Sequence, residues 1–181
     1  MANIIFINLD KAREAEVTQL TRDTISGAAT KAGLERIYIT SARRLPTEQA
    51  EAMYHNIVVK KRIIRYREPG RKVTELCQQL HKQGVGKETI IKRMTALIID
   101  LANNNQRVSL HCVSEEGYAQ KNVIDISKSI PLEMARRFIL SLAEQNTTSR
   151  IIQSVSSSIC ANKVSFDASE PAIHIEINQT V

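Results

Sequence analysis

The chain has 181 residues, of which 43% are hydrophobic and 24% charged, a composition that suits one domain with a buried core and excludes a chain that is disordered throughout. Gly 6 and Pro 4 exclude collagen-like and proline-rich chains, and the 4% aromatic content, without Trp, argues against binding by several aromatic faces. The formal net charge is +6, from 25 Lys and Arg against 19 Asp and Glu. We expect a single domain over residues 1–181.

The apolar residues in the first half of the chain predict strands that alternate with helices. In chain order these are a strand over 4–9, a helix over 10–32, a strand over 36–40 and a helix over 46–62. Asp10 can cap the first helix, and Gly33 can end it. Pro46 opens the second helix, where its missing N–H is harmless. Residues 68–70, Glu-Pro-Gly, are predicted to form a turn.

The second half predicts further helices, followed by a return to strands. In chain order we expect helices over 71–82 and 87–103, strands over 108–111 and 122–126, a helix over 131–145, and strands over 163–166 and 172–177. The helix over 87–103 has apolar residues at three- and four-residue spacing, which is typical of one buried face. These elements predict an α+β fold with a small antiparallel sheet that carries the site and is flanked by helices.

Basic residues are concentrated in one segment. Residues 60–93 hold eleven Lys and Arg against three Asp and Glu. This balance favours a polyanionic partner such as nucleic acid, anionic lipid head groups or an anionic cell-wall polymer, and the alternative is a solvated helical surface. Nucleic acid is disfavoured, because no helix-turn-helix or zinc-finger motif is visible and aromatic residues for stacking are few.

No apolar run approaches the roughly 18 residues that a membrane span needs, so we expect none. The first residues lack the basic start and the long apolar stretch of a signal peptide, and we expect the chain to be made in the cytoplasm. The three cysteines are widely spaced and form no Cys-x-x-Cys pair. This spacing argues against a disulfide framework and against an all-thiolate zinc site.

Two of the four histidines lie in apolar, strand-like segments. His111 ends one predicted strand, His174 stands between isoleucines of the last one, and Asp125 lies between β-branched residues fourteen positions after His111. Buried polar side chains are costly unless they pair or coordinate an ion. Two His and one Asp on separate strands would hold a divalent metal and leave a position for water, as in catalytic zinc sites. Ordinary hydrogen bonds between buried polar groups are the alternative.

A hydrolytic zinc site also needs a base that takes the proton of the attacking water. Glu170, four residues before His174, is the nearest candidate. Glu176 and Asp167 are the alternatives.

Three segments resemble, in order, the motifs of one superfamily. Residues 39–54 contain a strand followed by Arg, Pro, Gln-Ala and Met-Tyr; residues 109–126 contain Ser-x-His and then Asp; residues 170–177 contain an acid followed by His in a closing strand. Together they are similar to the zinc peptidoglycan peptidases. This superfamily includes VanX-type D-alanyl-D-alanine dipeptidases, VanY-type D,D-carboxypeptidases, phage L-alanyl-D-glutamate endopeptidases and hedgehog-like domains.

The resemblance implies zinc-dependent hydrolysis of a peptide bond next to a D-amino acid in a peptidoglycan stem peptide, of the D,D-carboxypeptidase or the L-Ala-D-Glu endopeptidase type. The implied ligands of Zn²⁺ are His111, Asp125 and His174, and the implied general base is Glu170. Arg44 would hold or polarise the substrate near the scissile carbonyl, and Ser109 and Gln49 would contact the substrate or support the site. Action on the cell wall would follow release from the cytoplasm or delivery by another system.

The sequence departs from the family's pattern in two places. The family has a shorter spacing between the first His and the Asp, and it usually has its acid three residues before the last His, where this chain has Pro171. The second departure leaves open a zinc-stabilised binding module without catalysis. A basic nucleic-acid-binding protein is the other alternative.

Overall fold

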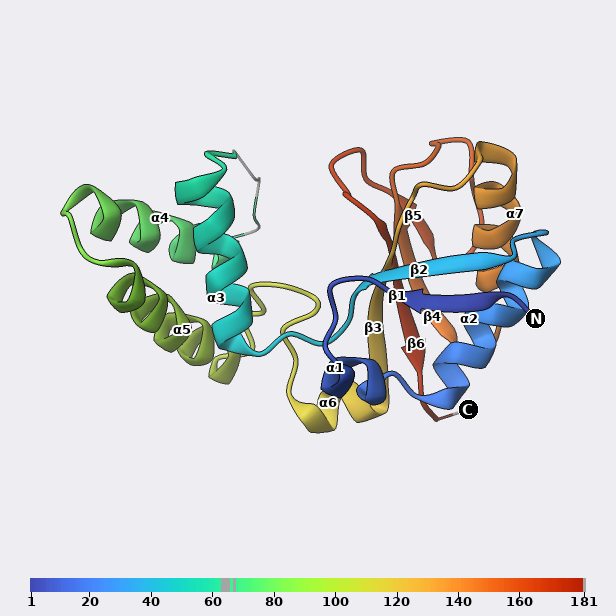
Figure 1. Cartoon of the computed structure of the whole chain (residues 1–181), viewed down its shortest axis with the longest axis horizontal. Coiled ribbons are helices and arrows are strands. Elements are labelled where there is room, and N and C mark those ends of the chain that lie inside the picture. The colour runs from blue at the N-terminus through green and yellow to red at the C-terminus, as the bar shows by residue number, and fades with distance from the viewer. Residues whose placement is uncertain (63–65, 67, 181) are drawn as a thin grey trace. The chain divides into compact units, whose positions relative to one another are not determined.

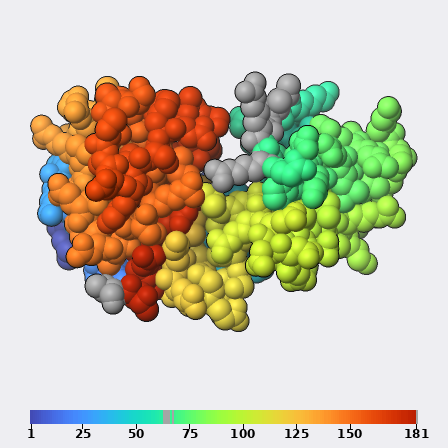
Figure 2. Space-filling model, turned by 180° about the vertical axis from the view of Figure 1, so that it is seen from behind, coloured from blue at the N-terminus to red at the C-terminus, as the bar shows by residue number. Residues whose placement is uncertain are grey.

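The computed structural model describes residues 1–62, 66 and 68–180, and the chain forms two compact units that we describe separately (Figure 1). Unit 1 comprises Met1–Arg43 and Glu115–Val181, and unit 2 comprises Arg44–Ser114. Figure 2 shows the N-terminal segment of unit 1, in blue, packed with its C-terminal segment, in orange and red. The expected single domain over 1–181 stays a prediction.

Unit 1 is built on an open sheet of six strands. The strands are β1 (Asn3–Phe6), β2 (Arg36–Ser41), β3 (Lys121–Ile126), β4 (Thr148–Gln153), β5 (Val164–Phe166) and β6 (Ile173–Asn178). They lie in the order β1-β2-β3-β6-β4-β5, with parallel pairing at the two edges, β1 with β2 and β4 with β5, and antiparallel pairing between. The predicted α+β fold with a helix-flanked sheet is confirmed, and the edge pairs make this sheet mixed.

The two faces of this sheet carry different side chains, because residues alternate along each strand. One face is a layer of fully buried isoleucines: Ile39, Ile124, Ile126, Ile151, Ile173, Ile175 and Ile177. The helices α2 (Gln19–Lys31) and α7 (Leu132–Ala143) pack together over the sheet (Figure 1). Burial of each isoleucine stabilises the fold by roughly 1.5–3 kcal/mol. The opposite face of β3 and β6 carries the polar residues of the candidate site.

The helix predicted over 10–32 is interrupted. Asp10 caps α1 (Lys11–Glu16) by accepting from the N–H of Arg13, and Thr18 caps α2 by accepting from the N–H of Thr21. Thr18 has extended backbone angles, so the chain leaves the helical path there and begins a second helix. Gly33, with φ of 78°, follows the last turn as expected.

Unit 2 is helical. Its elements are α3 (Pro46–Tyr54), a π-helical turn over His55–Val59, α4 (Glu68–Lys82) and α5 (Lys87–Asn103). Their facing sides form one apolar core, which includes Ala50, Met53, Val73, Cys77, Leu80, Ile90, Met94 and Ile98. The stripe predicted over 87–103 is therefore the buried face of α5.

Two local predictions are wrong, and one strand is missing from the prediction. Residues 108–111 form bends and turns rather than a strand, and α6 (Glu115–Gln120) precedes β3. Residues 68–70 form the first turn of α4, because a proline in the first helical turn gives up no intrahelical bond. The strand β4 is missing from the prediction, since its residues do not alternate between apolar and polar.

Within the described part of the chain, no helix combines the length and the apolarity that crossing a bilayer requires. The basic segment 60–93 contributes exposed residues to unit 2, among them Arg71, Lys72, Lys82, Lys87, Lys92 and Arg93. Arg65 and Arg67 of that segment lie outside the described residues.

Asn122 joins the start of α2 to the sheet, and we expect its loss to destabilise unit 1. Its Oδ1 accepts from the N–H of Thr18 at 3.0 Å and from the hydroxyl of Thr21 at 2.8 Å, and its Nδ2 donates to the carbonyl of Tyr118 at 2.9 Å. Asn122→Ala should lower the free energy of unfolding by about 2–4 kcal/mol, because it leaves buried donors unsatisfied. Denaturant titration measures this, and Asn162→Ala, at an exposed position, should change it by less than about 0.5 kcal/mol.

Candidate metal centre

Two of the predicted ligands lie next to each other on adjacent central strands of the sheet in unit 1. Asp125 on β3 is paired in register with His174 on β6. The Nδ1 atom of His174 lies 3.1 Å from Oδ1 of Asp125, and only 3% of the His174 side chain and 14% of the Asp125 side chain are exposed. Residues that are directly opposite in an antiparallel pair point to the same side. The register of β3 on β6 therefore creates this contact.

Glu176 lies two residues after His174 and so faces the same side of the sheet. Its Oε1 atom lies 3.7 Å from Nε2 of His174, an ion-pair distance that is longer than a hydrogen bond. Lys121 Nζ lies 3.1 Å from Glu176 Oε2, and Arg150 Nη1 lies 3.6 Å from Oε1. The histidine is thus between two carboxylates, one of which has two cationic neighbours.

These neighbours change the pKa of both groups. Burial alone would lower the pKa of His174, but the interactions with Asp125 and Glu176 outweigh it and raise the pKa to about 9. The interaction with His174 is the largest cause that lowers the pKa of Glu176 to about 2, with Lys121 adding to it against the effect of burial. Without a metal, His174 is therefore an imidazolium at neutral pH.

Four other predicted site residues lie together in unit 2. The N–H of Arg44 donates to the carbonyl of His111 at 2.9 Å, and the N–H of His111 donates to Oγ of Ser109 at 3.3 Å. The guanidinium of Arg44 donates through Nη1 to Oε1 of Gln49 at 3.4 Å. Both Gln49 and His111 are buried. The structure brings these residues into contact, and their functional roles stay predictions.

Asp125 and His174 of unit 1 are two side chains that can bind a metal ion. His111, the third predicted ligand, belongs to unit 2, and its place beside them stays a prediction. Imidazole nitrogen and carboxylate oxygen are common zinc donors, and tetrahedral zinc separates its ligand atoms by about 3.3–3.6 Å. The 3.1 Å between Asp125 and His174 is already close to that spacing. The donor types and the spacing of this pair therefore fit the ion.

Glu170, the predicted base, lies in the loop between β5 and β6. Its carbonyl accepts from Oγ of Ser154 at 2.6 Å and from Nζ of Lys128 at 3.2 Å, which anchors the loop through its main chain. The carboxylate of Asp167 accepts from the N–H and the hydroxyl of Ser169 at 2.9 and 2.6 Å, so Asp167 shapes the turn before Glu170. The assignment of Glu170 as base stays a prediction.

Arg43 is a buried partner that sequence analysis does not identify. Its Nε and Nη2 atoms donate to both carboxylate oxygens of Glu16, at 2.9 and 2.6 Å, and this interaction is the largest cause that lowers the pKa of Glu16. Arg13 adds a third bond at 2.6 Å. The neighbouring arginines thus differ, because Arg43 pairs with Glu16 within unit 1 whereas Arg44 contacts predicted site residues. Nothing in the sequence relates Arg43 to an acid 27 residues away.

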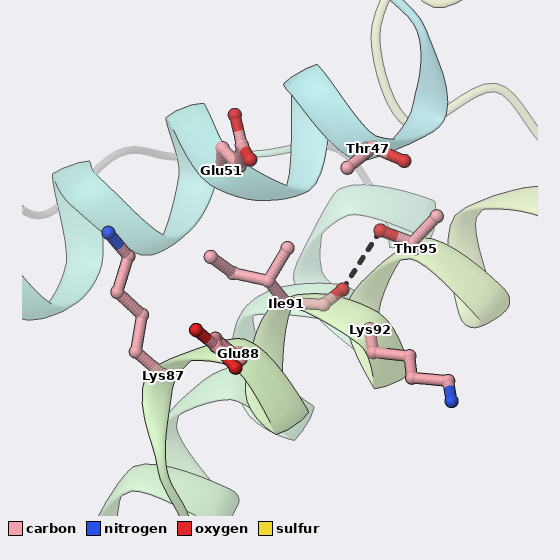
Figure 3. A pocket seen from close by; sticks show the side chains of 7 residues that line it. All are labelled: Thr47, Glu51, Lys87, Glu88, Ile91, Lys92 and Thr95. Carbon is pink, nitrogen blue, oxygen red and sulfur yellow. Dashed lines mark hydrogen bonds between the residues drawn. The ribbon is translucent and has the colours of Figure 1, made fainter.

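A separate pocket opens in unit 2 between α3 and α5, with a volume of about 500 Å³ (Figure 3). Its walls mix both charges with apolar and hydroxyl groups: Thr47, Glu51, Lys87, Glu88, Ile91, Lys92 and Thr95. Most of these residues are exposed, and no predicted site residue is among them. The pocket is therefore distinct from the candidate metal group.

Comparison of the chain with family models, with curated proteins and with solved structures finds no match. The resemblance to zinc peptidoglycan peptidases thus rests on the sequence motifs.

We expect the stability of the metal-free protein to depend on pH through His174 and Glu176. Folding raises the pKa of His174, so its contribution is complete below about pH 6.5 and is lost as the pH rises toward 9. Folding lowers the pKa of Glu176, so its contribution is complete above about pH 4.5 and is lost as the pH falls toward 2. Denaturant titration in chelator should show a loss on the order of 3 kcal/mol on the alkaline side, at up to about 1.4 kcal/mol per pH unit.

His174→Gln should flatten the alkaline decline, and Glu176→Gln should flatten the acidic one. His81→Gln alters an exposed histidine on α4 and should leave both declines in place. A free energy of unfolding that stays level between pH 6.5 and 9 in the unsubstituted protein would contradict the buried imidazolium.

Proposed function

We propose that the protein is a zinc metallopeptidase that hydrolyses a peptide bond next to a D-amino acid in peptidoglycan stem peptides. The observation that carries the proposal is the buried pair Asp125 and His174, whose Oδ1 and Nδ1 atoms lie 3.1 Å apart, and His111 is the proposed third ligand. Two histidines and one carboxylate leave a fourth position for water or substrate, which is the pattern of catalytic rather than structural zinc. The three motifs in family order support peptidoglycan as the substrate.

Each predicted site residue has a role in this proposal. His111, Asp125 and His174 hold the ion, and β3 and β6 fix the last two through paired strand positions. Zinc, when bound, supplies Lewis acidity toward the scissile carbonyl and toward the attacking water. The sheet limits the movement of its ligands, because Asp125 and His174 stand on central strands with buried isoleucines on either side in sequence.

Arg44 is the proposed residue that orients the substrate carbonyl. Its main chain is tied to His111 and its guanidinium contacts Gln49, so its position follows that of a proposed ligand. A guanidinium suits this role because it stays charged and stabilises a developing oxyanion without exchanging a proton. Gln49 and Ser109 support this arrangement through the bonds they make to Arg44 and His111.

Glu170 is the proposed general base, which would take the proton of the attacking water and pass it to the leaving amine. Its support is its place in the closing acid–His motif and a loop that Ser154 and Lys128 anchor at its carbonyl. Glu176 is a weaker candidate, because its interaction with His174, with Lys121 adding to it, lowers its pKa to about 2 and makes it a poor proton acceptor.

The charge of unit 2 supports attraction to an anionic cell-wall polymer as a secondary feature, since its helices expose Arg71, Lys72, Lys82, Lys87, Lys92 and Arg93. Action on the wall would then require release or delivery. The competing class is a nucleic-acid-binding protein, which would bind DNA in a salt-dependent way even after His111→Ala or chelation. The other alternative is a zinc-stabilised module without turnover.

We expect the zinc-loaded protein to cleave defined muropeptides and the chelated protein to leave them intact. Incubation with tetrapeptide and pentapeptide substrates, followed by mass analysis of the fragments, identifies the bond. His174→Ala should abolish both zinc retention and cleavage, because it removes a proposed ligand. His55→Ala, at an exposed position, is the matched control and should retain both. A zinc-loaded sample that cleaves none of these substrates would refute the peptidase proposal.

Glu170→Gln should lower kcat by roughly 10²–10⁴ while the bound zinc stays the same, because the amide cannot accept the proton. Steady-state cleavage rates and metal analysis of the same sample separate the two effects. Glu133→Gln, which makes the same change at an exposed site on α7, should keep full activity. Full activity of Glu170→Gln would assign the base elsewhere and leave the metal site standing.

A further inference from the structure

We propose that the pocket between α3 and α5 binds a short zwitterionic peptide, a di- or tripeptide with a free ammonium group at one end and a free carboxylate at the other. The pocket lies within unit 2 and has a volume of about 500 Å³, which is in the range of small-molecule sites. No predicted site residue lines it, so the proposed binding is independent of the peptidase proposal.

Four charged side chains line the pocket without pairing with one another. Glu51 comes from α3, and Lys87, Glu88 and Lys92 come from α5. Among the described residues, none of these four charged groups has an ion-pair or hydrogen-bond partner. Glu88 and Lys92 are four residues apart on one helix, a spacing at which opposite charges commonly pair. Because they stay apart, both groups remain available to a ligand.

The neighbouring helix α4 shows that exposed charges of unit 2 do pair elsewhere. Arg71 donates to the carboxylate of Glu68, and its Nε atom lies 3.9 Å from Oε1 of Glu75. These three side chains are between 57% and 63% exposed, so exposure by itself does not keep opposite charges apart. The unpaired charges are therefore a feature of the pocket.

The middle of the pocket is apolar. Ile91, which is 9% exposed, lies between the charged groups (Figure 3) and belongs to the apolar core of unit 2. The hydroxyl of Thr95 donates to the carbonyl of Ile91 at 2.9 Å, which leaves the hydroxyl oxygen able to accept another bond. These two residues suit a ligand with an apolar group over Ile91 and an N–H group facing Thr95.

The two ends of the pocket differ in charge. Figure 3 shows one end with Glu51, Lys87 and Glu88, and the other end with Thr47, Lys92 and Thr95. The first end has two carboxylates against one ammonium group, whereas the second has an ammonium group and no carboxylate. A ligand that complements both ends therefore carries a positive group at the first and a negative group at the second.

The spacing of the charges sets the length of the ligand. Glu88 and Lys92 are about one helical turn apart, roughly 6 Å along the axis of α5. An extended peptide advances about 3.3 Å per residue, so the charged ends of a di- or tripeptide match this separation. Its ammonium group would lie between Glu51 and Glu88, and its carboxylate would meet Lys92. A diamine or a dicarboxylate fits less well, because each places a like charge at one end.

The test titrates the full chain with trialanine in the presence of a chelator, which prevents metal-dependent cleavage. ¹H–¹⁵N correlation spectra report which backbone amides shift, and we expect shifts confined to α3 and the first half of α5. The N-acetylated and the C-amidated peptide should each bind roughly tenfold more weakly, because each lacks one charged contact. Absence of these shifts, equal affinity for free and doubly capped trialanine, or tighter binding of a diamine or a dicarboxylate would overturn the proposal.

Single substitutions test the two ends separately. Glu88→Gln and Lys92→Gln should each weaken trialanine binding roughly tenfold. Asp100→Asn on α5 and Lys82→Gln on α4 remove the same charges at exposed positions outside the pocket and should leave the affinity unchanged. Circular dichroism confirms that each variant is folded. Unchanged affinity in folded Glu88→Gln would overturn the proposal.

The two proposals fail separately. Trialanine binding by a protein that cleaves no muropeptide would support the peptide site and refute the peptidase. Muropeptide cleavage by a protein that does not bind trialanine would overturn the peptide site and leave the peptidase standing. His174→Ala, which removes a proposed metal ligand, should bind trialanine as the unsubstituted protein does.

Discussion

The contact between Asp125 and His174 is the interaction on which the rest of the site depends. It joins β3 to β6 at the middle of the sheet, where the same two strands bring their isoleucines together on the other face. Burying a charged pair is unfavourable unless its partners compensate for the lost water. Here Glu176 extends the pair, and Lys121 and Arg150 extend it further to the sheet surface. The apolar face stabilises the two strands, and their register places Asp125 beside His174 on the polar face.

The sequence locates this pair because an alternating strand separates its two faces. In Ile173-His174-Ile175-Glu176-Ile177 every second residue is isoleucine, so the polar residues must share the other side. The same argument holds for Asp125 between isoleucines of β3. What the sequence does not contain is the register of one strand on the other, which decides that Asp125 is opposite His174 and that Glu176 is opposite Val123. Register is set by long-range packing, and it is the register that brings these polar side chains into contact.

The errors of the sequence analysis have local physical causes. The loosely periodic apolar pattern runs past Val17, but α1 ends there and the side chain of Thr18 caps the start of a second helix. Residues 108–111 look like a strand because they are partly apolar, yet no strand pairs with them among the described residues. Arg43 and Arg44 are alike in sequence, and only the fold separates the one that pairs with Glu16 from the one beside Gln49. A local helix cap decides the first case, and long-range pairing decides the other two.

The carboxylates around His174 serve both the metal-free and the proposed metal-bound protein. Without an ion, Asp125 and Glu176 stabilise a proton on the ring and so keep the charged histidine in the sheet. A divalent ion bound by the ring would displace the proton from the nitrogen that it binds. Binding would therefore exchange one positive charge for a larger one at a place already built from acidic groups. Such a site can fold before it binds an ion, because the positive charge of the protonated histidine stabilises the buried carboxylates in its absence.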